Sequence, residues 1–189
     1  DRVGIMVKND KGEYVTITGN QTGVLLLDYL IGAKQRTGKM PEKPVALKTI
    51  VTTEMARKVA ETNGLACYDT FTGFKFLAEK KDKLENAGEG KVIFAYEESY
   101  GYMLGDYVRD KDAVTAALCL TEMAAWYAGQ GMTLYDALQK CYEKYGFYAE
   151  KTLNLVMPGL DGLKKMADLM AGLREHPPVE ISGVGVLQQ

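Results

Sequence analysis

Short apolar runs rich in β-forming residues alternate along this chain with segments of helical periodicity, and this alternation restricts the fold more than any other feature. Strands are expected at residues 44–51, 65–69 and 92–96, and helices near residues 22–34, 54–63 and 74–85. Strands that alternate with helices of about 10–15 residues are typical of a parallel-rich sheet with helices on both faces. The sequence therefore predicts an α/β fold.

The two ends of the chain are less regular. Strands are expected at residues 2–7 and 14–18, and helices at residues 112–128, 133–145 and 160–174. Residues 112–128 are apolar on most helical faces, so we expect this helix to be buried. Residues 146–157 alternate as in an exposed, antiparallel strand. The tail that follows His176-Pro177-Pro178 is typical of a connector.

Composition limits the classes of partner. A chain of 189 residues suits one α/β domain with a small appendage, and its net charge of −2 provides no attraction for nucleic acid or an anionic membrane. No apolar stretch approaches the roughly 20 residues that span a bilayer. Cys67, Cys119 and Cys141 lie far apart in apolar segments, as expected for buried thiols in a reducing compartment. We therefore predict a cytoplasmic protein without nucleic-acid or membrane partners.

The best indication of function is the segment Glu97-Glu98-Ser99, which follows the apolar strand at residues 92–96. In open α/β sheets, ligands bind beyond the carboxyl ends of the strands. Carboxylates accept strong hydrogen bonds from hydroxyl groups, and the neighbouring Tyr96, Tyr100 and Tyr102 offer aromatic surfaces that suit a sugar. The alternative interpretation is a solvated acidic turn.

Two further segments allow both a structural and a functional interpretation. Thr72 is a suitable N-cap for the helix at residues 74–85, and exposed N–H groups at such a helix start also favour oxygen-rich ligands. Residues 109–112, Arg-Asp-Lys-Asp, fit an ordinary helix start, but their basic pair could equally contact a phosphate. The glycine patterns of dinucleotide-binding folds and P-loops are absent.

Taken in order, four segments resemble motifs of the alpha-D-phosphohexomutase superfamily, which includes phosphoglucomutases and phosphomannomutases. Asp1-Arg2-Val3-Gly4 resembles the end of the D-x-D-x-D-R magnesium loop, and Thr72-Gly73-Phe74-Lys75 resembles T-G-(W/F)-K. Glu97-Glu98-Ser99-Tyr100-Gly101 resembles the G-E-E-S-(F/Y)-G sugar-binding loop, and Arg109-Asp110-Lys111-Asp112 resembles R-(D/E)-K-D. Segments within residues 159–174 also resemble a bacterial phosphoglucomutase subfamily. Tyr96 stands where the family often has glycine, which would alter the approach to the loop.

The resemblance implies the third of four domains, a three-layer α/β/α sandwich around a mixed, mostly parallel four-stranded sheet with one antiparallel strand. Residues 1–7 would be a remnant of the preceding domain, and residues 8–157 the sugar-binding domain. Residues 158–189 would connect to a fourth domain that is missing here. The start at Asp1, without an initiator methionine, likewise leads us to expect an excerpt of a longer polypeptide.

The resemblance also implies an activity for the parent protein. A phosphoserine on the first domain, aided by Mg²⁺, would interconvert glucose 1-phosphate and glucose 6-phosphate through a hexose bisphosphate. The expected roles are these: Asp1 as one magnesium ligand of a partial site, Arg2 as a supporting catalytic residue, Thr72 and Gly73 at the sugar, Glu97 and Ser99 on its hydroxyls, and Lys111 on phosphate or sugar.

The chain lacks the T-x-S-H-N-P stretch of the nucleophilic serine, two of the three magnesium aspartates and the S-G-T-E-P-type phosphate loop. We therefore expect it to be inactive alone, with hexose phosphate and the other parental domains as its partners. Two alternatives remain open. One is a self-standing carbohydrate- or metabolite-binding module without catalysis, and the other is a structural or interaction domain.

Overall fold

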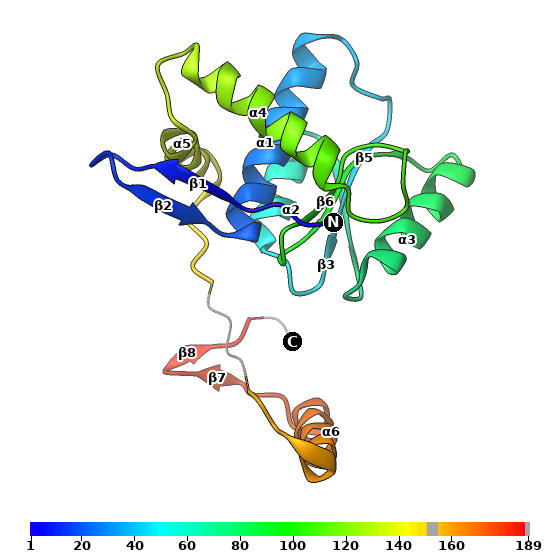
Figure 1. Cartoon of the computed structure of the whole chain (residues 1–189). Coiled ribbons are helices and arrows are strands. Elements are labelled where there is room, and N and C mark those ends of the chain that lie inside the picture. The colour runs from blue at the N-terminus through cyan, green and yellow to red at the C-terminus, as the bar shows by residue number, and fades with distance from the viewer. Residues whose placement is uncertain (151–154, 188–189) are drawn as a thin grey trace. The chain divides into compact units, whose positions relative to one another are not determined.

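The structure is a computed structural model that describes residues 1–150 and 155–187. The chain divides into two compact units, residues 1–150 and residues 151–189, and each is described by itself (Figure 1). This division does not test the domain boundaries expected from the resemblance, which remain predictions.

The first unit is built around a four-stranded sheet with the order β4-β3-β5-β6. Its strands are β3 (Pro44–Thr49), β4 (Ala66–Thr70), β5 (Lys91–Glu97) and β6 (Gly101–Met103). β3 is parallel to β4 and to β5, whereas β6 runs antiparallel to β5. β3 and β5 are buried along almost their whole length, which explains why both are continuous apolar runs in the sequence. The mixed, mostly parallel sheet confirms the predicted fold class.

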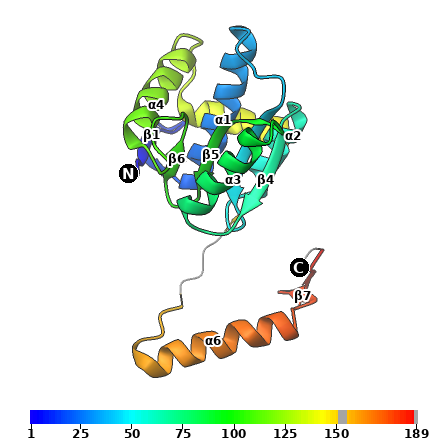
Figure 2. The same cartoon turned by 90° about the vertical axis from the view of Figure 1, so that its right-hand side faces the viewer.

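Helices cover both faces of this sheet. They are α1 (Gly19–Arg36), α2 (Glu54–Thr62), α3 (Phe74–Asn86), α4 (Ala113–Ala128) and α5 (Leu134–Tyr145). α3 packs alone on one face, whereas α1, α2, α4 and α5 share a larger core on the other (Figures 1 and 2). Three layers result, and the carboxyl ends of β3, β4 and β5 lie at one edge of the sheet.

An aromatic cluster of Phe94, Tyr96 and Tyr102 fills the centre of the larger core. The Phe94 and Tyr96 rings are stacked with centroids 5.2 Å apart, and Tyr102 lies 6.2 Å from Tyr96. Gly23 of α1 lies against this cluster, because a Cβ atom there would overlap the Tyr96 ring. The absence of a side chain at Gly23 therefore lets α1 approach β5 closely.

The expected burial of the helix at residues 112–128 is wrong in part. Only one stripe of α4 is buried, formed by Ala116, Cys119, Leu120 and Met123. Val114 and Leu118 on another face are 80% and 69% exposed. Because apolar residues occur on all faces of this helix, the sequence alone did not indicate which face is packed and which is exposed. Trp126, near the end of α4, lies 3.9 Å below the Arg36 guanidinium of α1.

Before the sheet, β1 (Ile5–Lys8) and β2 (Tyr14–Ile17) form an antiparallel hairpin. Val7 and Ile17 of this hairpin contribute to the larger core, so the start of the chain is packed on the first unit. Thr18 then caps α1 with a capping box. Residues 2–4 were expected to belong to the first strand, but they precede it and are not in a strand.

The predicted strand at residues 146–157 is wrong where the structure describes it, since residues 146–150 and 155–157 are not in a strand. Residues 151–154 lie outside the described part. The antiparallel strand of the sheet is β6 instead, which is only three residues long and carries too little alternation to be recognised. The described part of the second unit contains α6 (Gly159–Glu175), which confirms the helix expected at residues 160–174. It also contains a small hairpin of β7 (Glu180–Ile181) and β8 (Val184–Gly185), where a plain connector was expected.

Cys119 and Cys141 are buried and Cys67 is half-buried, and all three thiols are free. Burial raises the pKa of Cys67 to about 11 and the pKa of Cys119 and Cys141 to about 12. These thiols are therefore protonated at neutral pH, as expected for structural cysteines. Among the described helices, none combines the length and the apolar character that a membrane crossing requires.

Candidate functional site

The acidic segment forms a tight hairpin between β5 and β6. Glu97 is the last residue of β5 and pairs in register with Gly101, so the turn itself consists of residues 98–100. Tyr100 has φ 67, a left-handed conformation that closes such a three-residue turn. Glu97 was expected beyond the strand, but pairing with β6 extends the strand by one residue. Glu97 is therefore held in a buried position, with 7% of the residue exposed.

The first residues of the chain lie against this turn. The Arg2 guanidinium donates from Nη2 to Glu97 Oε1 over 3.4 Å, and the Val3 N–H donates to the Tyr100 carbonyl over 3.2 Å. Arg2 remains more than half exposed while its partner carboxylate is nearly covered. The hairpin therefore presents a carboxylate together with a guanidinium that still faces solvent.

Lys111 approaches the same carboxylate from the segment before α4. A Cβ atom on Gly101 would lie 2.5 Å from Lys111 Cδ and 2.8 Å from Glu97 Oε1, so both side chains converge on the space above this glycine. Lys111 Nζ lies 3.6 Å from Asp1 Oδ1 and 2.7 Å from Asp110 Oδ1. The hydrogen bond from Lys111 lowers the pKa of Asp110.

The start of α3 borders this group. Phe74, the first residue of α3, lies with its ring centroid 5.1 Å from Lys111 Nζ. The expected N-cap at Thr72 is wrong, because Gly73 holds that position with φ 110 and no side chain caps the described helix. A glycine is required there because a left-handed φ strains other residues. Thr72 is exposed and Gly73 half-buried, whereas Phe74 at the helix start is buried.

The aromatic surfaces expected beside the carboxylates are mostly unavailable. Tyr96 and Tyr102 are 1% exposed in the core cluster, and only Tyr100 is accessible, at 37%. The strand alternation explains this, because Tyr96 and its register partner Tyr102 face the larger core. The expectation that Tyr96 alters the approach to the loop remains untested, although its ring points into the core.

Of the predicted site residues, the structure brings Asp1, Arg2, Glu97 and Lys111 together. Gly73 precedes Phe74, whose ring contacts Lys111 of this group. Ser99 lies in the turn at residues 98–100, directly after Glu97. No described contact links the side chains of Ser99 or Thr72 to the other predicted residues. The sequence placed Gly101 at the end of the predicted loop but did not indicate that the side chains of Glu97 and Lys111 meet at this glycine.

The residues that the structure describes contain no cluster of three or more His, Cys, Asp or Glu side chains arranged for a metal ion. Asp1 offers one carboxylate, and Lys111 rather than a second acid faces it. Divalent magnesium prefers several oxygen ligands, so this donor set does not fit a complete magnesium site.

Comparisons with known proteins agree with this geometry. Residues 18–145 match the family described as phosphoglucomutase/phosphomannomutase, alpha/beta/alpha domain III. A phosphoglucomutase of Staphylococcus aureus strain MSSA476 is 34% identical over 186 residues, which cover 98% of this chain and 33% of the relative. The homologue from bovine strain RF122 is 35% identical with the same coverage. The chain thus spans about a third of the length of the curated relatives it matches.

Solved structures support the fold. A proposed phosphomannomutase from Thermus thermophilus matches with a TM-score of 0.59 and 23% identity, covering 77% of this chain and 29% of that one. Parafusin, a phosphoglucomutase from Paramecium, matches with a TM-score of 0.55 and 21% identity, covering 78% and 23%. With the family match over residues 18–145, the sheet order and the hairpin, these findings show that the chain belongs to the alpha-D-phosphohexomutase superfamily as its domain III.

Proposed function

We propose that this chain is the sugar-recognition domain of a phosphoglucomutase that interconverts glucose 1-phosphate and glucose 6-phosphate. The single observation that carries the proposal is the convergence of Glu97, Arg2 and Lys111 around Gly101. This arrangement places an acceptor for hydroxyl groups between two cations, at the edge of the sheet where ligands of open α/β folds bind. The reaction would proceed through a phosphoserine and a hexose bisphosphate, both involving other parts of a longer protein.

Glu97 and Ser99 would hold the hydroxyls of the sugar ring. When a pyranose turns end for end, C1 and C6 exchange places, but the 3- and 4-hydroxyls remain a similar equatorial pair. A carboxylate and a hydroxyl that bind this pair can hold both orientations with one set of contacts. Binding energy realised there positions the reacting end of the substrate.

Arg2 and Lys111 would supply positive charge for the phosphate, with Thr72 and Gly73 at the start of α3 completing the contact. Phosphoryl transfer depends largely on positioning and electrostatic stabilisation, so two cations near a dianionic group fit this chemistry. Arg2 is already placed by Glu97, and Lys111 is held between Asp1 and Asp110. A phosphate would compete with these carboxylates for the same cations.

We assign no step of the reaction to magnesium, because Asp1 provides only one carboxylate. We propose Asp1 as one ligand of an ion whose other ligands lie elsewhere in a longer protein. One solved neighbour, the N-acetylphosphoglucosamine mutase of Aspergillus fumigatus in complex with GlcNAc-6P and magnesium, matches this chain at 12% identity. A cytoplasmic location is likewise proposed, because the three cysteines are free thiols, as is usual in a reducing compartment.

The test is an assay of glucose 1-phosphate conversion by two proteins. The first, called the longer protein below, is the product of the complete open reading frame that contains this sequence, and the second is the 189 residues alone. We expect turnover by the first and none by the second. In the longer protein, Glu97→Ala should lower kcat/KM on the order of 100-fold, because a buried hydrogen bond to a charged group contributes about 2–3 kcal/mol.

Glu89→Ala is the matched control, since this exposed glutamate lies in the turn before β5, at the opposite end of the same strand. Its activity should equal that of the unchanged protein. Full activity of the Glu97→Ala protein would remove Glu97 from the site. Turnover by the 189 residues alone would contradict the proposal that they need other domains.

A further inference from the structure

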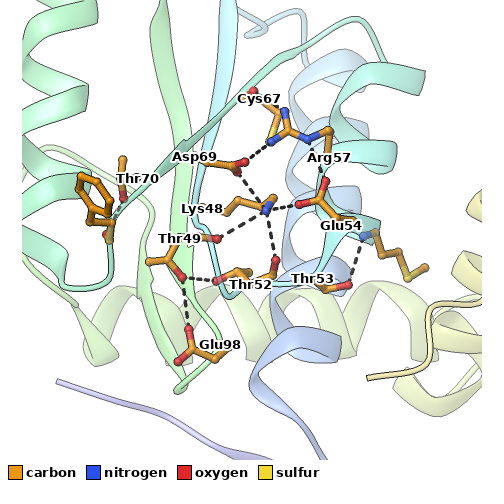
Figure 3. A network of polar contacts seen from close by, with 12 residues as sticks. Lys48, Thr49, Thr52, Thr53, Glu54, Arg57, Cys67, Asp69, Thr70 and Glu98 are labelled. Atoms are coloured by element: carbon orange, nitrogen blue, oxygen red, sulfur yellow. Dashed lines mark hydrogen bonds and ion pairs between the residues drawn. The ribbon is translucent and has the colours of Figure 1, made fainter. Parts of the chain in front are cut away.

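A buried lysine lies at the carboxyl end of β3, next to the candidate site but outside it. Lys48 is 1% exposed, and its Nζ atom contacts four oxygens (Figure 3). They are Glu54 Oε1 at 2.6 Å, Asp69 Oδ1 at 3.0 Å, the Thr52 carbonyl at 3.1 Å and the Thr49 carbonyl at 3.5 Å. Because an isolated ammonium is costly to bury, these contacts indicate that the cation is fully paired.

Arg57 closes a ring of charges around Lys48. Its guanidinium donates to Glu54 Oε2 over 2.9 Å and also pairs with Asp69, so each carboxylate serves both cations. Burial alone would raise the pKa of Glu54, but the hydrogen bonds from Lys48 and Arg57 lower it. We call these four residues, Lys48, Glu54, Arg57 and Asp69, the Lys48 network. They come from β3, α2 and β4, so the network joins three elements at one edge of the sheet.

The carbonyl contacts of Lys48 have a separate effect, because they fix the turn at residues 49–52 between β3 and α2. This turn carries the hydroxyls of Thr49 and Thr52, both buried, with oxygens 2.7 Å apart. Thr49 Oγ1 also donates to Glu98 Oε2 over 3.3 Å. Since a hydroxyl has one proton, Thr49 can donate to Glu98 only if Thr52 donates to Thr49. The direction of the chain of hydrogen bonds is therefore set, from Thr52 through Thr49 to Glu98.

Glu98 is the first residue of the turn that carries the candidate site. Its carbonyl lies so close to Gly19 of α1 that a Cβ atom there would overlap it, and Tyr100 is fixed by the Val3 N–H. The backbone of the turn is thus held from two sides, and the side chain of Glu98 is held from a third, by Thr49. The adjacent Glu97 and Ser99 take their directions from this same turn.

We propose that the Lys48 network is a positioning device for the Glu97-Glu98-Ser99 turn, acting through the 49–52 turn and the Thr49 hydroxyl on Glu98. Lys48 and Thr49 touch no predicted substrate group, so they are positioning residues. The ligand-binding consequence rests on the proposed function, whereas the ordering of the turn does not.

The experiment compares amide chemical shifts of the 189-residue chain with those of Thr49→Val, which keeps the shape of the side chain and removes its donor. We expect shifts at residues 97–101, and loss of glucose 1-phosphate affinity of about five- to tenfold in the longer protein, because a hydrogen bond to a charged group is lost. Thr49→Ser keeps the hydroxyl and should restore both.

Thr70→Val is the matched control. Thr70 is the register partner of Thr49 on β4, and its hydroxyl donates to the neighbouring Phe71 carbonyl over 3.0 Å instead of to the turn. This substitution should leave the amide shifts of residues 97–101 unchanged. Unchanged shifts at these residues in the Thr49→Val chain would overturn the proposal, as would equal shifts in both variants.

A double-mutant cycle of Thr49→Val and Glu98→Ala on the urea unfolding of the chain gives an independent measure. We expect the two changes to be coupled by about fivefold in the unfolding equilibrium constant, whereas additive effects would contradict the contact. Lys48→Met should shift the same amides, and if it does not fold, Glu54→Gln weakens the network from its exposed side. Shifts confined to residues 48–70 would refute the role of the network.

The two proposals fail in different ways. If coupling and amide shifts appear but the longer protein neither binds nor converts glucose 1-phosphate, the proposed function is wrong and the positioning device remains. If the longer protein is active but Thr49→Val alters neither the turn nor the affinity, the function stands and the positioning proposal is wrong.

Discussion

Gly101 shows how much one residue without a side chain contributes to the candidate site. The Lys111 stem and the Glu97 carboxylate occupy the space that a Cβ atom would need, at 2.5 Å and 2.8 Å. Any larger residue would push one of them away, and a misplacement of about 1 Å at such a site can cost up to about 100-fold in rate.

We therefore predict that Gly101→Ala lowers kcat/KM of the longer protein for glucose 1-phosphate by about 10- to 100-fold, measured by steady-state kinetics. Gly4→Ala is the control, because its Cβ atom would meet Tyr100 Cδ1 at an ordinary 3.9 Å. This variant should retain activity. Equal kinetics for the two variants would show that the convergence of Glu97 and Lys111 does not matter.

At the residue scale, motifs predicted which side chains meet but not how each one is held. Glu97, Arg2 and Lys111 were found from the sequence, since their segments carry recognisable residue types in order. Arg2 and Glu97 are 95 residues apart in the sequence, and no local sequence pattern predicts a contact over such a separation. Thr49 was likewise unrecognisable, because a threonine at a strand end has many ordinary roles.

At the scale of elements, the contact between α1 and β5 depends on Gly23. A Cβ atom at this position would overlap the Tyr96 ring, which is itself stacked against both Phe94 and Tyr102. The ring cannot move aside without disturbing the cluster, so α1 would have to shift away from the sheet.

We predict that Gly23→Ala lowers the free energy of unfolding by about 1–3 kcal/mol, as overpacking of a filled core does, measured by urea denaturation. Gly32→Ala in the same helix is the matched control. Its Cβ atom would meet only the flexible end of Arg36, at 2.9 Å, so better helix propensity should stabilise the chain by up to about 1 kcal/mol. Destabilisation of equal size in both variants would contradict this account.

Regular elements were predictable where one local signal dominated. β3 and β5 were found because both of their faces are buried. α2 and α5 were found because a threonine, at positions 53 and 133, stands where each helix begins and caps it. β6 was missed because its three residues show no period. The exposure of α4 was missed because apolar composition indicates what can be buried, whereas the tertiary fold decides which face is covered.

At the scale of the whole molecule, paired carboxylates link stability to pH. Burial would raise the pKa of Glu54 and Glu85, but hydrogen bonds from Lys48 and Arg57 to the first, and from Lys81 to the second, lower both from 4.5. The unfolded chain therefore takes up protons at pH values where the folded chain keeps these groups charged. Their stabilisation is present above about pH 4.5 and is lost as the pH falls further.

We predict that the urea midpoint of the chain is constant between about pH 5 and 8 and decreases steadily from about pH 4.5 to pH 3. Glu85→Gln should reduce this decrease, because one of the linked groups is gone. Glu89→Gln, at the exposed turn nearby, is the control and should leave the pH profile unchanged. A midpoint that stays flat down to pH 3 would show that these ion pairs contribute nothing.

Because Arg2 contacts the β5–β6 hairpin, this hairpin cannot be transferred to another protein by itself with the candidate site intact. A peptide of residues 91–103, or a graft of that segment onto another scaffold, would keep both glutamates but lose the guanidinium that arrives from the amino-terminal segment. To change hexose selectivity in this family, the hairpin and residues 1–4 should therefore be exchanged together.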